Sequence, residues 1–312
     1  MQVDTLNVVN RVVSWQRAEM PCWWVTVLVT HGGSPAPVGS VFALNEAEEA
    51  VGSIGSPALT RVLAQRLIKH TPRTPVDWVF GADATQARAL DFPVGADPVT
   101  VRVEPVRPEH RDGFAAMAQL LGARCSAERD SLSGAVREVP PQSAVLPDGR
   151  DAVVYHPPWR LLLSGAAPVT IAVADVAPAL HFECVVFEPR APYRAAWPRR
   201  AGLADVRLVS ELADSVASTL DAKTAVLALA HDPAVDDPLL WLALDTPVFL
   251  VGALGSRANH AARLERLALR GASADALARI EGPVGLDIRS RTPAEIGVAI
   301  LAQLIAARAA GA

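Results

Sequence analysis

Two stretches in the second half of the sequence carry residues suited to binding a nucleotide-like ligand. In the first, LLLSGAAPVT (residues 161–170), Gly165 follows an apolar run and precedes a helical pattern. Glu188 comes about 20 positions later, the spacing of the carboxylate that binds ribose in dinucleotide sites. Ala167 and Ile171 stand where such sites have their second and third glycines, which weakens the pattern. The stretch therefore indicates either a weakened nucleotide site or a structural turn.

The second stretch begins at Gly252 and runs through Gly255, Ser256 and Arg257 into a helical pattern. A serine cap, the free N–H groups of a first helical turn and an adjacent guanidinium together favour a phosphate or another anion. An ordinary capped helix with a solvated arginine would contain the same residues. Both interpretations remain open at this level.

Three further polar residues follow predicted strands, namely Arg190, His231 and Asp232. His231 and Asp232 could orient a polar ligand or take part in acid–base chemistry, and they could equally be ordinary loop residues. Ligands of open parallel sheets bind at the carboxyl ends of the strands, near the point where the strand order reverses. We therefore expect these residues to gather at that edge of the sheet.

The second half alternates apolar strands with helical patterns, which is typical of a parallel sheet covered on both faces. Strands are predicted at residues 160–165, 183–189, 205–210, 224–230 and 247–252. Helices are predicted at residues 168–181, from near Glu211, at 236–244, at 257–270 and from Pro293. The predicted fold class is α/β, with a C-terminal Rossmann-like doubly wound sheet.

The first half predicts a smaller α+β domain. Strands are expected at residues 24–30, 41–44 and 99–105, with a helix capped by Ser56 and another over residues 108–125. Between residues 139 and 158 the sequence is rich in prolines and turn-forming residues, as linkers are. We therefore expect domains at residues 1–150 and 151–312.

The overall composition excludes several classes of protein. The net charge is −4, without a sustained basic run, so a nucleic-acid surface is not expected. The three cysteines are widely separated and the histidines lack ligand spacing, which argues against a metal site. The N-terminus lacks the regions of a signal peptide, and no apolar stretch is long enough for a bilayer. A cytoplasmic location is predicted.

Several motifs are more specific than this general pattern. They are VFLVGALGSR, GPVGLDIRSRTPAEIGVAILAQLIAAR, AHDPAVDDPLL, GGSPAPVGSVFAL, VGSIGSPALT, LLLSGAAP and VVFEPR. In their order along the whole chain they resemble the XdhC/CoxI family, the xanthine dehydrogenase accessory factors.

The resemblance implies a homodimeric chaperone of the molybdenum cofactor (molybdopterin) without turnover of its own. Such a protein protects the cofactor during sulfuration by a cysteine desulfurase and passes it to a molybdenum hydroxylase such as xanthine dehydrogenase. On this hypothesis the cofactor-binding residues are Gly165, Glu188, Arg190, His231, Asp232, Gly252, Gly255, Ser256 and Arg257. Asp287, in GLDI, would fix the loop that closes the site. No catalytic residue and no metal ligand is assigned.

The sequence departs from the family pattern after VGSIG, where the family commonly has two glycines, a cysteine and an acidic residue. Ser56, Pro57, Ala58 and Thr60 stand at those positions. This departure supports one alternative, a scaffold that docks a hydroxylase or a cofactor-binding homologue without holding the cofactor. A second alternative, based on the fold alone, is an oxidoreductase that uses NAD(P) or another nucleotide, against which the missing second glycine argues.

Overall fold

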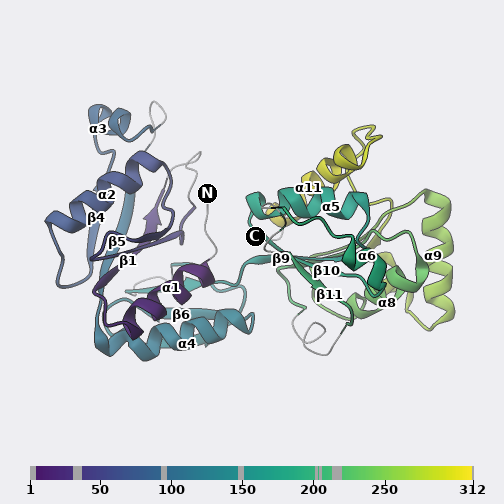
Figure 1. Cartoon of the computed structure of the whole chain (residues 1–312), viewed down its shortest axis with the longest axis horizontal. Coiled ribbons are helices and arrows are strands. Elements are labelled where there is room, and N and C mark those ends of the chain that lie inside the picture. Colours follow the sequence, from purple (N-terminus) through teal and green to yellow (C-terminus); the bar gives the residue numbers. More distant parts are fainter. Residues whose placement is uncertain are drawn as a thin grey trace. The chain divides into compact units, whose positions relative to one another are not determined.

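The computed structural model divides the chain into two compact units. The described residues are 5–30, 37–92, 97–146, 151–200, 203, 206–212 and 220–310. Unit 1 comprises residues 1–157 and unit 2 residues 158–312 (Figure 1). The division lies after Pro157 rather than at residue 150, and the strand Ala152–Tyr155 pairs with a strand of unit 1.

Unit 1 is built on an antiparallel sheet with the strand order β3-β2-β1-β5-β4. The strands are β1 (Cys22–Val29), β2 (Val41–Asn45), β3 (Ala50–Gly52), β4 (Val76–Phe80) and β5 (Val99–Val106). The central strand β1 is apolar on both faces because both are covered. Helix α2 (Pro57–Lys69) packs on one face, and α1 (Thr5–Arg17) and α4 (Arg111–Gly122) share a core with the other.

A second, smaller antiparallel sheet completes unit 1. It has the order β7-β6-β8, with β6 (Ser126–Asp130), β7 (Val136–Val139) and β8 (Ala152–Tyr155). Buried polar contacts join the two sheets: the indole N–H of Trp24 donates to the Tyr155 hydroxyl at 3.0 Å, and Glu104 pairs with Arg129. Together with the short helix α3 (Ala84–Ala89), these elements confirm an α+β unit at the N-terminus.

Unit 2 contains a parallel sheet with the strand order β11-β10-β9-β12-β13-β14. Its strands are β9 (Trp159–Ser164), β10 (Phe182–Phe187), β11 (Arg207–Val209), β12 (Thr224–Ala228), β13 (Leu250–Ala253) and β14 (Ile280–Glu281). The chain builds outward from β9 in one direction and then returns to build from β12 in the other. The strand order therefore reverses between β9 and β12, as in doubly wound dinucleotide-binding folds.

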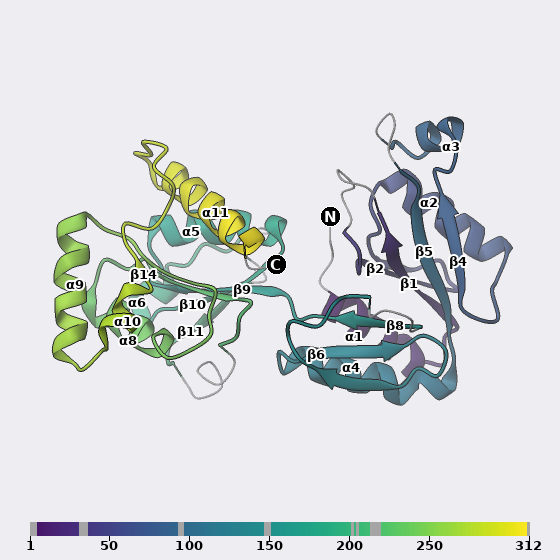
Figure 2. The same ribbon diagram turned by 180° about the vertical axis from the view of Figure 1, so that it is seen from behind.

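Helices cover both faces of this sheet. On one face, α5 (Pro168–Val176) and α11 (Pro293–Ala310) lie side by side, as Figures 1 and 2 show. On the other face lie α8 (Pro233–Ala243), α9 (Arg257–Leu269) and α10 (Ala274–Ala278). The predicted α/β class, with a Rossmann-like doubly wound sheet, is confirmed.

Some helix boundaries differ from the sequence-based ones. The helix predicted over residues 168–181 ends at Val176 and continues as the 3₁₀ turn Ala177–Leu180, which contains Pro178. Helix α8 begins at Pro233 rather than at residue 236, because the Asp232 carboxylate caps it. The helix expected from near Glu211 falls mainly on residues 213–219, outside the described residues. Within the described residues, no helix combines the length and hydropathy needed to cross a membrane.

Candidate functional site at the carboxyl edge of the parallel sheet

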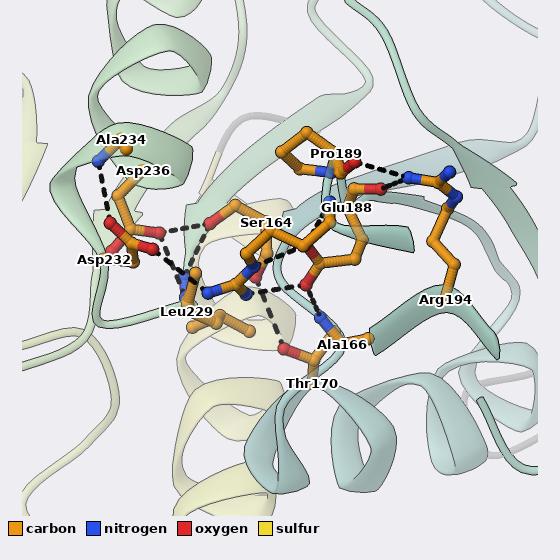
Figure 3. A network of polar contacts seen from close by, with 12 residues as sticks. Ser164, Ala166, Thr170, Glu188, Pro189, Arg194, Leu229, Asp232, Ala234 and Asp236 are labelled. Atoms are coloured by element: carbon orange, nitrogen blue, oxygen red, sulfur yellow. Dashed lines mark hydrogen bonds and ion pairs between the residues drawn. The ribbon is translucent and has the colours of Figure 1, made fainter. Parts of the chain in front are cut away.

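The loops that follow β9, β10 and β12 meet at the point where the strand order reverses. Figure 3 shows polar contacts around Ser164, Glu188, Asp232 and Asp236, which come from the end of β9, from the loops after β10 and β12, and from α8. Gly165, Glu188, Arg190 and Asp232, which the sequence singled out, lie in or beside this network. Parallel strands place their carboxyl ends at one edge, and this is why residues so far apart in sequence meet here.

Glu188 is fully buried and its carboxylate is satisfied by the protein itself. One oxygen accepts hydrogen bonds from the Ala166 N–H at 2.9 Å and from Nη2 of Arg190 at 2.7 Å. The other accepts from the N–H and Nε of Arg190, at 3.0 and 2.7 Å. Burial by itself raises the pKa of Glu188, but these hydrogen bonds and the guanidinium charge outweigh it, so the pKa is lowered. The carboxylate stays ionised and has no oxygen left over for a ribose.

Arg190 extends this contact across the sheet edge. Its Nη1 lies 3.1 Å from Oδ2 of Asp232, whose other oxygen accepts the Ala234 N–H and caps α8. β10 and β12 flank β9, so the chain Glu188–Arg190–Asp232 joins the loops on either side of the β9 turn. The guanidinium also lies 4.0 Å from the ring centre of Tyr193. The edge where a dinucleotide would lie in this fold is thus bridged by an ion pair, an arrangement that disfavours the NAD(P) alternative.

Gly165 allows the β9 and β12 loops to touch. Its φ is +79°, and a Cβ at this position would lie 2.5 Å from Cβ of Ala230. Gly165 therefore keeps the turn-forming role of the first glycine of a nucleotide-binding loop. Ala167 begins α5 without a side-chain cap, in keeping with the missing second glycine.

A buried pair that the sequence analysis did not single out lies beneath these loops. The Ser164 hydroxyl donates to Oδ1 of Asp236 and accepts the Leu229 N–H at 3.0 Å, while the Ala230 N–H also donates to Oδ1 at 3.0 Å. Burial raises the pKa of Asp236, although these hydrogen bonds and the nearby Arg263 oppose the shift. The sequence signals for this pair were a serine at the end of an apolar strand and an aspartate in the first turn of α8.

The end of β13 and the turn into α9 carry four more of the predicted residues. Ser256 caps α9 by accepting the Asn259 N–H at 3.2 Å, and Arg257 is exposed at the first helical position. Gly255 has a φ of +136°, which favours glycine. Gly252 has a packing role, because a Cβ there would lie 2.6 Å from Val284 and 2.9 Å from Leu227. The turn therefore presents a capped helix N-terminus with an arginine beside it.

Two further predicted residues lie outside both the network and the β13–α9 turn. His231 is exposed and has a φ of +56°, and none of the hydrogen bonds of the described network involves its side chain. Asp287 is also exposed, and its carboxylate accepts the Arg289 N–H at 3.3 Å. The structure thus places both in surface loops. Their assignment to a binding site remains a prediction.

The cysteines are poorly suited to bind a cofactor or accept sulfur as thiolates. Burial raises the pKa of the Cys22 and Cys184 thiols to about 12. Burial, together with the nearby Glu138, also raises the pKa of Cys125. All three therefore stay protonated at neutral pH. Among the described residues, no group of three or more His, Cys, Asp or Glu side chains is arranged to hold a metal ion.

Unit 1 has a cavity of its own, of about 480 Å³, between the sheet and α2. Its lining is mostly apolar, with a few polar side chains at the rim, as in many ligand pockets. The lining residues are Phe42, Leu44, Glu48, Ala50, Gly52, Ser53, Gly55, Pro57, Thr60, Arg61, Ala64 and Ile68. The cavity therefore borders the VGSIGSPALT segment, in which this sequence departs from the family pattern.

Comparison with protein families decides the relationship. Residues 161–304 match the model of the XdhC Rossmann domain, and residues 15–70 match that of the XdhC and CoxI family. The chain belongs to the XdhC and CoxI family. Both units contain a matched segment, and the residues that line the unit 1 cavity all fall within the N-terminal one.

Curated relatives cover part of the chain. It is 27% identical over 156 residues to the molybdenum cofactor insertion chaperone PaoD of Escherichia coli, a match over 50% of this chain and 42% of PaoD. It is 29% identical over 147 residues to the uncharacterized protein YqeB of the same organism, over 47% of this chain and 27% of YqeB. The matched segment thus spans less than half of either relative.

A crystal structure described as that of a xanthine dehydrogenase from Bacillus halodurans has a similar fold. The TM-score is 0.67 at 21% identity, and the match covers 97% of this chain and 96% of that one. At this identity the similarity establishes the XdhC-like fold across both units and no more.

Proposed function

We propose that this protein binds the molybdenum cofactor and delivers it to a molybdenum hydroxylase such as a xanthine dehydrogenase, without turnover of its own. Membership of the XdhC and CoxI family carries the proposal. The similarity to PaoD, a molybdenum cofactor insertion chaperone, supports it over half of the chain. The cytoplasmic location, the homodimer and the cysteine desulfurase partner remain predictions from the sequence.

The residues at the carboxyl edge of the parallel sheet fit an anionic cargo. Molybdopterin carries a phosphate, and the N-terminus of α9 offers first-turn N–H groups together with the exposed Arg257. Arg190 belongs to the same edge, but its guanidinium is already paired with two carboxylates. We therefore propose that the cargo binds through the Gly255–Arg257 turn more than through the loop after β9.

The test is cofactor content after expression in a host that synthesises molybdopterin. Purified protein is oxidised and the pterin is quantified by its fluorescence, with Arg257→Ala as the variant. Arg270→Ala is the matched control, because it removes an exposed arginine just beyond the other end of α9. We expect stoichiometric pterin in the wild type and the control, and a loss of about tenfold or more in affinity in Arg257→Ala.

A scaffold without cofactor is the second candidate. Two observations favour it: the protein itself satisfies Glu188, and Ala58 stands where a thiol is common in the family. Purification with a hydroxylase partner but without pterin would establish this alternative. The chaperone proposal fails if the protein retains no pterin and does not raise hydroxylase activity in cells that lack it.

A further inference from the structure

Arg263 on helix α9 is a buried cation with unused hydrogen-bond donors. The residue is 5% exposed, and among the described residues Nε and Nη1 find no hydrogen-bond partner. Arg266, one turn further along the same helix, pairs with both oxygens of Asp237 at 2.9 and 3.1 Å. A buried arginine usually has its donors satisfied, so the unused donors of Arg263 call for an acceptor.

The guanidinium of Arg263 lies against the turn that begins α9. Helical side chains lean toward the N-terminus, and Nη2 of Arg263 donates to the Leu254 carbonyl at 3.0 Å. Leu254 directly precedes the Gly255–Ser256 turn, and the exposed Arg257 directly follows it. The turn thus has one arginine buried against it and another exposed at the first position of the helix. Helix α9 has 13 residues, long enough for its N-terminus to favour an anion.

The carboxylate nearest to Arg263 does not satisfy it. Oδ2 of Asp236 lies 3.9 Å from Nη2, beyond hydrogen-bond distance, and Oδ1 is already occupied by Ser164 and Ala230. Burial lowers the pKa of Arg263, but a guanidinium remains charged at neutral pH. An oxyanion would supply an acceptor for these donors, in a charge-assisted hydrogen bond of the kind that arginine makes with phosphate.

We propose that Arg263 is the buried cation of a phosphate subsite beneath the β13–α9 turn, completed by the N-terminus of α9. The identification of this phosphate as that of the pterin cargo rests on the proposed function. The subsite itself rests on the contacts of Arg263. An ordered water molecule could instead satisfy one of the free donors, and this alternative predicts no specific response to phosphate.

Thermal unfolding of the full chain in inorganic phosphate, against sodium chloride at matched ionic strength, tests the subsite. Binding to the folded state raises the Tm with phosphate concentration. Arg263→Lys keeps the charge beside Asp236 but removes the guanidinium N–H donors, and Arg266→Lys is the matched control. We expect the wild type and the control to respond to phosphate, and Arg263→Lys to bind it about tenfold or more weakly.

Two results would overturn the subsite: a wild type that responds no more to phosphate than to chloride, or an Arg263→Lys variant that responds like the wild type. Arg263→Met, a neutral side chain of similar length, provides a second variant if the lysine variant does not fold. If neither variant folds, a wild type that responds no more to phosphate than to chloride still overturns the subsite.

Pterin retention separates the subsite from the proposed function. Loss of pterin in Arg263→Lys, with retention in Arg266→Lys, supports the assignment of the phosphate to the cargo. Full retention in Arg263→Lys overturns that assignment. If the wild type shows an Arg263-dependent phosphate response but holds no pterin, the proposed function fails and the anion subsite stands.

Discussion

Glu188 is a carboxylate at the position of a ribose ligand, but it binds other groups of the protein instead. Its position at the end of β10 is that of a ribose-binding carboxylate, yet four hydrogen bonds from the protein occupy it. The proline-separated arginine in Glu-Pro-Arg makes this possible, because Arg190 turns back onto the carboxylate from two residues away. The residue type alone could not have distinguished a ligand contact from an internal ion pair.

Replacing Glu188 with glutamine should destabilise unit 2 in a pH-dependent way. The pKa of Glu188 in the folded protein is below the ordinary value of 4.5, so its carboxylate stabilises the fold fully above about that pH. The stabilisation is lost as the pH falls through the lower, folded-state pKa. We expect Glu188→Gln to cost about 2 kcal/mol in the free energy of unfolding at pH 7, with a smaller difference below pH 4.5.

Urea unfolding of both proteins across this pH range measures the difference. Glu183→Gln is the control, since it removes a partly exposed carboxylate paired with Arg160 near the opposite end of the same strand. A difference between wild type and Glu188→Gln that stays constant down to the acid limit would contradict the internal ion pair.

At the scale of elements, the sequence predicted the parts of the fold that depend on local pattern. Continuous apolar strands with helices between them indicated the parallel sheet, because strands buried on both faces have no polar side. Ser56 before Pro57 predicted the start of α2, and the structure shows the cap. Helix α1 was not predicted. The sheet formed by β6, β7 and β8 was not predicted either, because β8 lies in the proline-rich stretch that resembles a linker.

The candidate site could be predicted only in part, for a physical reason. Strand ends located Gly165, Glu188 and the Gly255 turn, because parallel topology brings such ends together. Contacts between side chains were not predictable in this way. The pairing of Ser164 with Asp236 and the burial of Arg263 depend on how α8 and α9 pack on the sheet. The sequence of these helices does not indicate that packing.

The contact between the β9 and β12 loops predicts a large effect of a single methyl group. Gly165→Ala places a Cβ 2.5 Å from Cβ of Ala230, at a φ of +79° that an alanine adopts with strain. Overpacking and backbone strain together should cost about 2–4 kcal/mol in the free energy of unfolding. Chemical denaturation of the purified variant measures this cost.

Gly122→Ala provides the comparison for this substitution. It lies at the end of α4, and an added Cβ there would meet no atom within 4 Å outside its own stretch of helix. We expect it to be neutral or to stabilise unit 1 by about 0.5 kcal/mol, because alanine favours the helix over glycine. If Gly165→Ala proves as mild as Gly122→Ala, the two loops do not approach as closely as the structure indicates.

At the scale of the whole molecule, the position of the division between the units decides which fragments can fold. The buried residues form separate clusters within each unit, so each has a core of its own. Strand β8 belongs to the core of unit 1: Val153 and Tyr155 are buried there, and the strand pairs with β6. A cut at residue 150 would remove this strand from unit 1 and leave it as an unpaired apolar extension of unit 2.

We therefore expect residues 1–157 and 158–312, expressed separately, each to unfold in one cooperative thermal transition. Residues 1–150 should be unstable, because the fragment exposes an edge of β6 and leaves Trp24 without the Tyr155 hydroxyl. Residues 151–312 should aggregate more readily than 158–312, since Ala152–Tyr155 carries four buried residues that lose their cover. Scanning calorimetry and size-exclusion chromatography of the four fragments test this. Equal stability of 1–150 and 1–157 would mean that β8 adds nothing to unit 1 and that the boundary lies where the sequence composition alone would place it.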